Sequence, residues 1–166
     1  MYNRSMKRSI AAFKYGARKE YGRYYAAELA KKHESWIKKT GAQALIPVPI
    51  HKERHKKRGY NQAKVIADYL EGETGIPVID DYLIRIKNTE ALKELSAAER
   101  KASLEDAFLV SETSKLLYRN LRCVILVDDI YTTGSTINEC AATLKKSGVL
   151  KVYFLCACIG KDQGGE

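Results

Sequence analysis

The chain has 166 residues, 45% of them hydrophobic and 30% charged, which are the proportions of one soluble globular domain. No apolar stretch approaches the roughly 20 residues of a transmembrane helix, so we expect no membrane insertion and a cytoplasmic protein. The net charge of +9 is uneven, because residues 1–64 hold 17 Lys/Arg against 4 Asp/Glu. This asymmetry suggests an anionic partner, such as a phosphorylated small molecule, nucleic acid or an acidic surface, although a solvated helix face explains scattered lysines better.

In chain order, the spacing of apolar side chains predicts helices over residues 5–13 and 20–39. Residues 44–50 predict a buried strand that ends among prolines, because proline cannot donate to a sheet. A basic loop is expected to follow. Residues 61–73 then predict a third helix, which ends near Gly75.

In the second half of the chain, residues 76–86 predict one or two strands and residues 96–104 a helix. The clearest strand covers residues 122–128, whose uninterrupted Val-Ile-Leu-Val run indicates burial on both faces. A helix over residues 135–146 and a strand over residues 149–159 complete a β-α-β unit. Such a unit implies a parallel sheet flanked by helices.

No repeat or linker divides the chain, so we expect one α/β domain over residues 1–166. It would have a small helical N-terminal region in residues 1–40 and an α/β core with a mostly parallel sheet in residues 41–160. The four cysteines lack the spacing and the histidine partners of a zinc site, so we interpret them as small buried apolar residues. They are Cys123, Cys140, Cys156 and Cys158.

The segment 124–136, with the sequence VILVDDIYTTGST, predicts the site. A buried strand delivers Asp128 and Asp129 to its C-terminal edge, where ligands of α/β sheets bind. A loop of small hydroxyl residues with one glycine then opens a helix whose free N–H groups attract phosphate. The loop residues are Thr132, Thr133, Gly134, Ser135 and Thr136. The two aspartates can accept hydrogen bonds from the vicinal hydroxyls of a sugar, and the neighbouring loop can bind a phosphate. Together they predict a site for ribose 5-phosphate.

Other classes of protein share an apolar strand followed by two acids. A P-loop ATPase needs a GxxxxGK[ST] segment upstream, which this sequence lacks. A receiver domain places its paired aspartates near the start of the domain, whereas here they lie in the last quarter. An acidic turn that caps a helix would explain Asp129 but not the dense run of hydroxyl residues.

The strand, the two acids and the T-T-G-x-T loop resemble the signature of type I phosphoribosyltransferases, and further segments are similar to the ComF family. The similar segments contain Phe13, Lys14, Tyr15, Gly16 and Arg18; Pro47, Val48, Pro49, His51, Arg54, Arg58, Gly59, Asn61 and Gln62; and Arg85, Thr89, Leu95, Arg100, Ala107 and Phe108. Members of this family usually begin with a zinc ribbon, so we expect a short form that lacks it. Leu92 and Ser103 replace the usual glutamine and asparagine, which affects the expected recognition of an acceptor.

The resemblance implies that the ligand is 5-phosphoribosyl 1-pyrophosphate and that magnesium is the cofactor. Asp128 and Asp129 would be the catalytic acids, which hold the ribose 2- and 3-hydroxyls directly or through water. Residues 132–136 would bind the 5-phosphate. Magnesium would bridge oxygens of the ligand and would not occupy a cage built only from protein, with the two acids as its candidate protein ligands.

The resemblance also implies a place for the pyrophosphate, on Lys52, Arg54 and Arg58 after the first strand. The same basic segment, with Tyr60 among its cations, also suits nucleic acid. Arg85 and Arg100 would either reach the site from a covering loop or form ordinary surface ion pairs.

Two classes of function remain open from the sequence. The first is an enzyme of nucleoside metabolism that transfers phosphoribosyl, as a glycosyltransferase, to an unidentified nitrogen acceptor. The second is a non-catalytic protein that keeps the ligand site and works in competence and DNA uptake, with single-stranded DNA or DNA-uptake proteins as partners.

Overall fold

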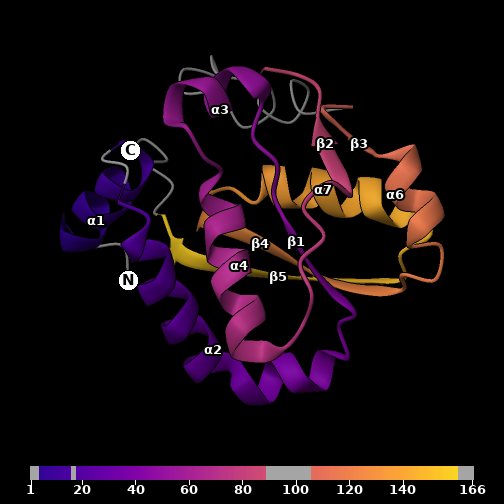
Figure 1. Cartoon of the computed structure of the whole chain (residues 1–166), viewed down its shortest axis with the longest axis horizontal. Helices are drawn as coiled ribbons and strands as arrows, with labels where there is room; N and C mark the ends of the chain where they lie inside the picture. The colour runs from indigo at the N-terminus through magenta and orange to yellow at the C-terminus, as the bar shows by residue number, and fades with distance from the viewer. Residues whose placement is uncertain (1–3, 16–17, 89–105, 161–166) are drawn as a thin grey trace.

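The computed structural model of the chain describes residues 4–15, 18–88 and 106–160, which form a mixed α/β fold (Figure 1). The predicted helix over residues 96–104 lies outside these ranges, as do Arg100, Leu92 and Ser103. Within the described ranges, no helix combines the length and the apolar character needed to cross a bilayer.

A parallel sheet forms the centre of the described structure, with three strands in the order β1-β4-β5. These strands are β1 (Ala44–Pro47), β4 (Cys123–Tyr131) and β5 (Lys151–Ile159). Residues 124–127 of the middle strand have no exposed surface, because helices cover both faces of the sheet. The α/β fold with a parallel sheet, predicted from the uninterrupted apolar run, is thereby confirmed.

Helices α2 (Glu20–Thr40) and α4 (Gln62–Thr74) pack on one face of the sheet, and α7 (Ser135–Lys146) packs on the other (Figure 1). Side chains alternate along β4, so Ile125 faces the core shared with α2 and α4, whereas Leu126 faces the core shared with α7. The connections that leave β1 and β4 thus run to opposite faces, which opens a crevice between their carboxyl ends.

The N-terminal helix, α1 (Arg4–Tyr15), is anchored to this framework by Phe13. The Phe13 side chain is fully buried, and its ring centroid lies 5.9 Å from that of Tyr25 and 6.0 Å from that of Tyr60. The Tyr60 hydroxyl also donates a hydrogen bond to the Phe13 carbonyl. These contacts fix the last turn of α1, which contains Lys14.

The basic segment after β1 is a helix, α3 (Lys52–Arg58), so its prediction as a loop was wrong. The His51 side chain caps the start of α3 by accepting from the Glu53 N–H at 3.4 Å, and Gly59 ends it in the left-handed conformation with φ 77°. Helix α3 buries no residue, so it has no apolar periodicity to detect, although lysine and arginine are good helix formers.

A second sheet pairs β2 (Leu83–Arg85) with β3 (Phe108–Val110) in antiparallel orientation, and α6 (Glu112–Leu117) follows it. Of the strands predicted in residues 76–86, the structure forms β2 and an isolated parallel bridge between Val78 and Leu45. Strand β3 and helix α6 are too short to produce a periodic sequence pattern, and they were not predicted.

Candidate functional site

The paired acids lie within the last part of β4, which continues to Tyr131 instead of ending at Asp128 as predicted. The backbone N–H of Val48 donates to the Val127 carbonyl at 2.9 Å, so the segment after β1 runs directly beside the acids. This position is the crevice between adjacent parallel strands whose connections run to opposite faces of the sheet, where α/β proteins bind ligands.

A cavity of about 170 Å³ occupies this crevice. Its polar lining comes from α1, α3, the start of α4, β2, the end of β4 and the loop that follows it: Lys14, Arg54, Arg58, Asn61, Gln62, Arg85, Asp128, Asp129, Thr132 and Thr136. The cavity therefore brings together the predicted acids, part of the predicted hydroxyl loop and most of the predicted cations, from segments far apart in the sequence.

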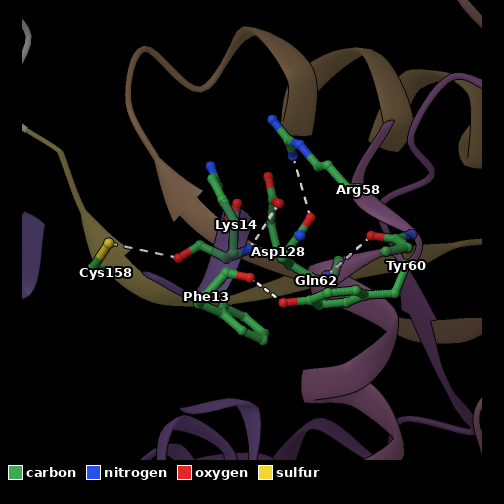
Figure 2. A network of polar contacts seen from close by, with 10 residues as sticks. Phe13, Lys14, Arg58, Tyr60, Gln62, Asp128 and Cys158 are labelled. Carbon is green, nitrogen blue, oxygen red and sulfur yellow. Dashed lines mark hydrogen bonds and ion pairs between the residues drawn. The ribbon is translucent and has the colours of Figure 1, made fainter. Parts of the chain in front are cut away.

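Asp129 is held by Lys14, which in the sequence belongs only to the N-terminal segment that resembles a known family. The Lys14 ammonium lies 2.8 Å from a carboxylate oxygen of Asp129, and the two side chains are 19% and 9% exposed. Figure 2 shows this part of the site with Lys14, Asp128 and Cys158 labelled. The Cys158 thiol donates to the Asp129 carbonyl at 3.6 Å. The ion pair joins the N-terminal helix to the strand that carries the site.

Asp128 behaves differently from its neighbour. Its side chain accepts a hydrogen bond from the backbone N–H of Asp129 at 2.8 Å and lines the cavity, where it keeps partial contact with solvent. Burial, followed by the nearby Asp129 carboxylate, raises the pKa of Asp128 to about 8. A carboxyl group with a perturbed pKa in a cleft indicates a functional site.

The hydroxyl loop curls around a second cavity of about 30 Å³, which shares Asp128, Thr132 and Thr136 with the first. Gly134 precedes α7 with φ 79° and has no side chain that could cap it, while the Ser135 N–H donates to the Thr133 hydroxyl at 3.4 Å. The positive end of the helix faces this loop, a position that suits phosphate. A Cβ atom at Gly134 would lie 2.5 Å from the Tyr131 hydroxyl, so the loop conformation requires glycine.

The predicted cations separate into two sets. Arg54 and Arg58 line the cavity, whereas Lys52 is exposed at the start of α3 and does not line it. Arg85 lies on β2 and not on a loop, and it is buried at 9% exposure, so it is not the surface residue that was considered. Burial, and then the like charge of Arg54, lower the pKa of Arg85. Two close cations in one cavity favour an anion between them.

The chain is similar in sequence to proteins named for competence and DNA utilization. Competence protein F of Haemophilus influenzae is 40% identical over 111 residues, which are 66% of this chain and 47% of that protein. DNA utilization protein YhgH of Escherichia coli K12 is 32% identical over 114 residues, 69% of this chain and 48% of that protein. Competence protein ComFC of Bacillus subtilis is 28% identical over 147 residues, 89% of this chain and 56% of that protein. The chain spans about half the length of the curated relatives it matches, and no family model matches it.

Proposed function

Because the chain belongs to the ComF family, we propose that its cavity binds 5-phosphoribosyl 1-pyrophosphate, within a fold of the type I phosphoribosyltransferase kind. One observation carries the proposal: Asp128 and the start of α7 border the same cavity as Arg54, Arg58 and Arg85. The Asp128 carboxylate can accept hydrogen bonds from neutral hydroxyl groups, whereas the start of α7 and the arginines can donate hydrogen bonds to phosphate oxygens. A ribose with phosphates at both ends satisfies all of these groups.

The ligand would lie across the two cavities. Its 5-phosphate accepts from the N–H groups and hydroxyls of residues 132–136, and the Asp128 carboxylate accepts from the ribose hydroxyls. Asp129 takes part in ribose binding directly or through water while it remains paired with Lys14. The pyrophosphate lies against Arg54, Arg58 and Arg85.

Magnesium fits this arrangement as a cation carried by the ligand. It prefers oxygen ligands and retains several waters, and the two acids supply carboxylate oxygens beside the place of the pyrophosphate. Among the described residues, no cluster of three or more acidic, histidine or cysteine side chains could hold a metal ion without a ligand. When bound, magnesium neutralises charge on the pyrophosphate as it leaves.

The reaction supported by this geometry is transfer of phosphoribosyl to a nitrogen nucleophile, as in nucleoside metabolism. The bond between the anomeric carbon and the pyrophosphate oxygen breaks, a bond to the acceptor nitrogen forms, and pyrophosphate leaves with the bonding electrons. The chain contributes position and charge: the arginines stabilise the leaving group, and Asp128 stabilises the cationic sugar of the transition state.

A thermal-shift titration with 5-phosphoribosyl 1-pyrophosphate and magnesium tests ligand binding. At a ligand concentration of 100 times Kd, the folded state gains about 2.7 kcal/mol, which raises the unfolding midpoint by roughly 5–10 °C for a chain of this size. The double variant Asp128→Asn/Asp129→Asn should respond much less. Asp68→Asn, which removes an exposed acid paired with Lys64, is the matched control and should respond as the parent does. Equal shifts in parent and double variant would contradict the proposed role of the acids.

A second function, the handling of single-stranded DNA, is favoured by the relatives named for competence and DNA utilization and by the +13 charge of residues 1–64. If about four DNA phosphates are neutralised, affinity should fall about 50-fold between 50 and 200 mM salt. Fluorescence anisotropy with labelled single-stranded DNA measures how the affinity depends on the salt concentration.

A variant and an activity assay distinguish the two functions. Salt-sensitive DNA binding that Asp128→Asn leaves unchanged supports DNA handling through another surface. Release of pyrophosphate on incubation with magnesium and candidate bases supports phosphoribosyl transfer. Binding insensitive to salt would contradict the DNA function.

A further inference from the structure

Strand β5 is the last strand of the parallel sheet, and among the residues that the structure describes no strand pairs with its outer edge. The Lys151 N–H donates to the Arg122 carbonyl at 2.9 Å, so the backbone groups of Lys151 face β4. Because successive residues of a strand turn their backbone groups to alternate sides, those of Val152 and Phe154 point away from β4. An edge of nine residues is an open template for another strand.

A groove of about 710 Å³ lies between β5 and helix α2. Several large apolar side chains of this groove reach solvent, because Tyr24 is 60% exposed, Phe154 43% and Ile159 66%. Trp36 of α2 extends the same surface, with its ring centroid 5.7 Å from that of Tyr153. Exposed aromatic side chains gathered beside an unpaired strand edge indicate a surface that contacts another chain.

The side of α2 that borders the groove has a symmetric pattern. Exposed side chains at intervals of four residues form one row along the helix, which we call the α2 row: Tyr24, Glu28, Lys32 and Trp36. The α2 row is symmetric about Ala30, with opposite charges two positions away and aromatic rings six positions away. If a second α2 lies antiparallel to the first, Glu28 of each copy meets Lys32 of the other. Tyr24 meets Trp36 in the same way.

The same two-fold axis passes through the middle of β5. Helix α2 runs opposite to β5, and Trp36 contacts Tyr153 (Figure 1). The six residues from Trp36 back to Ala30 rise about 9 Å in a helix, the length of about three residues in a strand. Ala30 therefore lies at about the level of Cys156, next to Leu155, the central residue of β5. One axis thus serves both the pairing of two β5 strands and the contact of two α2 rows.

The charges of the α2 row are available to a second copy. Neither Glu28 nor Lys32 forms an ion pair with any residue in the described part of the chain. The neighbouring row of α2 differs, because the Lys38 ammonium lies 2.6 Å from the Glu34 carboxylate. Opposite charges that meet across an interface select one orientation of the two copies.

We propose that the chain forms a two-fold dimer, in which the β5 strands of two copies pair antiparallel and their α2 rows meet across the axis. The described strands then form one continuous sheet, in the order β1-β4-β5-β5-β4-β1. Such pairing closes both strand edges and covers the exposed aromatic side chains of the groove. Each ligand cavity lies at the carboxyl ends of its own strands, so the two cavities lie at opposite ends of the joined sheet. The dimer does not depend on which ligand these cavities bind.

Sedimentation equilibrium of the parent chain tests the dimer, and exchange of charges tests its axis. The parent should show twice the mass of one chain. Glu28→Lys puts two lysines in each α2 row and Lys32→Glu puts two glutamates there, so either variant alone places like charges opposite each other twice. Each should dimerise about 10- to 100-fold more weakly than the parent. An equal mixture of the two variants should form a heterodimer, because every lysine then meets a glutamate.

A second pair of variants tests the strand edge. Phe154→Lys places a charge on the outer edge of β5 close to the axis, and it should abolish the dimer. The matched control is Leu116→Lys, because Leu116 is 76% exposed on α6 and does not line the groove. This variant should dimerise as the parent does. Circular dichroism and the unfolding midpoint of each variant distinguish a lost contact from a lost fold.

Three results would overturn the proposed dimer. A parent that stays a monomer at roughly 100 µM would show that the β5 edge does not pair with a second copy. A dimer that neither charge exchange weakens would place the interface on another surface. Weakened variants whose mixture forms no heterodimer would show that Glu28 and Lys32 do not meet across a two-fold axis.

Discussion

Replacement of Lys14 by methionine should lower the free energy of unfolding by about 3 kcal/mol, as expected when one partner of a buried ion pair is removed. The Lys14 ammonium lies 2.8 Å from the Asp129 carboxylate, which is only 9% exposed. Methionine fills much of the space of the lysine stem but leaves the carboxylate buried without a cation. Urea denaturation of parent and variant, with m-values compared, measures the loss.

Two further variants make this prediction specific. Lys38→Met breaks an ion pair of similar length, 2.6 Å to Glu34, but both of its side chains are well exposed, so it should change stability little. Lys14→Met/Asp129→Asn removes both charges of the buried pair and should recover part of the loss. A Lys14→Met variant as stable as Lys38→Met would show that Asp129 does not depend on the N-terminal helix.

The fold could be predicted from the sequence wherever burial produces a regular pattern. The run in residues 124–127 is buried on both faces, as expected for a strand of a parallel sheet covered by helices, so the central strand and the helix after it were predicted. Helix α3 was missed because it buries no residue. The continuation of β4 beyond Asp128 to Tyr131 was missed because acidic residues such as Asp129 are rare in strands, and the pairing of Ile130 and Tyr131 with β5 is decided by tertiary contacts.

The candidate site could be predicted where chemistry lies in one continuous segment. The acids and the hydroxyl loop are adjacent in the sequence, and the structure places them around two cavities that share Asp128, Thr132 and Thr136 in their lining. Lys14 and Gln62 were not assigned to the site, because their places depend on how α1 and α4 pack against β4. A lysine or a glutamine carries no local sign of its partner, and only burial and orientation in the folded chain reveal it.

Affinity for 5-phosphoribosyl 1-pyrophosphate with magnesium should fall about fivefold from pH 8 to pH 7, because the ribose hydroxyls need Asp128 as an ionised acceptor. Burial, with Asp129 beside it, raises the pKa of Asp128 to about 8, so a proton competes with the ligand below that pH. Above about pH 9 the affinity should become constant. Calorimetric titrations from pH 6.5 to 9 on parent and Asp128→Asn measure this dependence, and the asparagine variant, which cannot ionise, should show only the titration of the ligand itself.

The stability of the ligand-free protein should have the opposite pH dependence. A carboxyl group whose pKa is higher in the folded state than its ordinary value of 3.8 binds its proton more tightly when folded. Its stabilising contribution is therefore complete below about pH 4, and it is lost as the pH rises toward 8. The difference in free energy of unfolding between parent and Asp128→Asn should shift against the parent across this window. If the difference stays constant while affinity still rises with pH, the proton that competes with the ligand belongs to another group, and Asp128 does not hold the ribose.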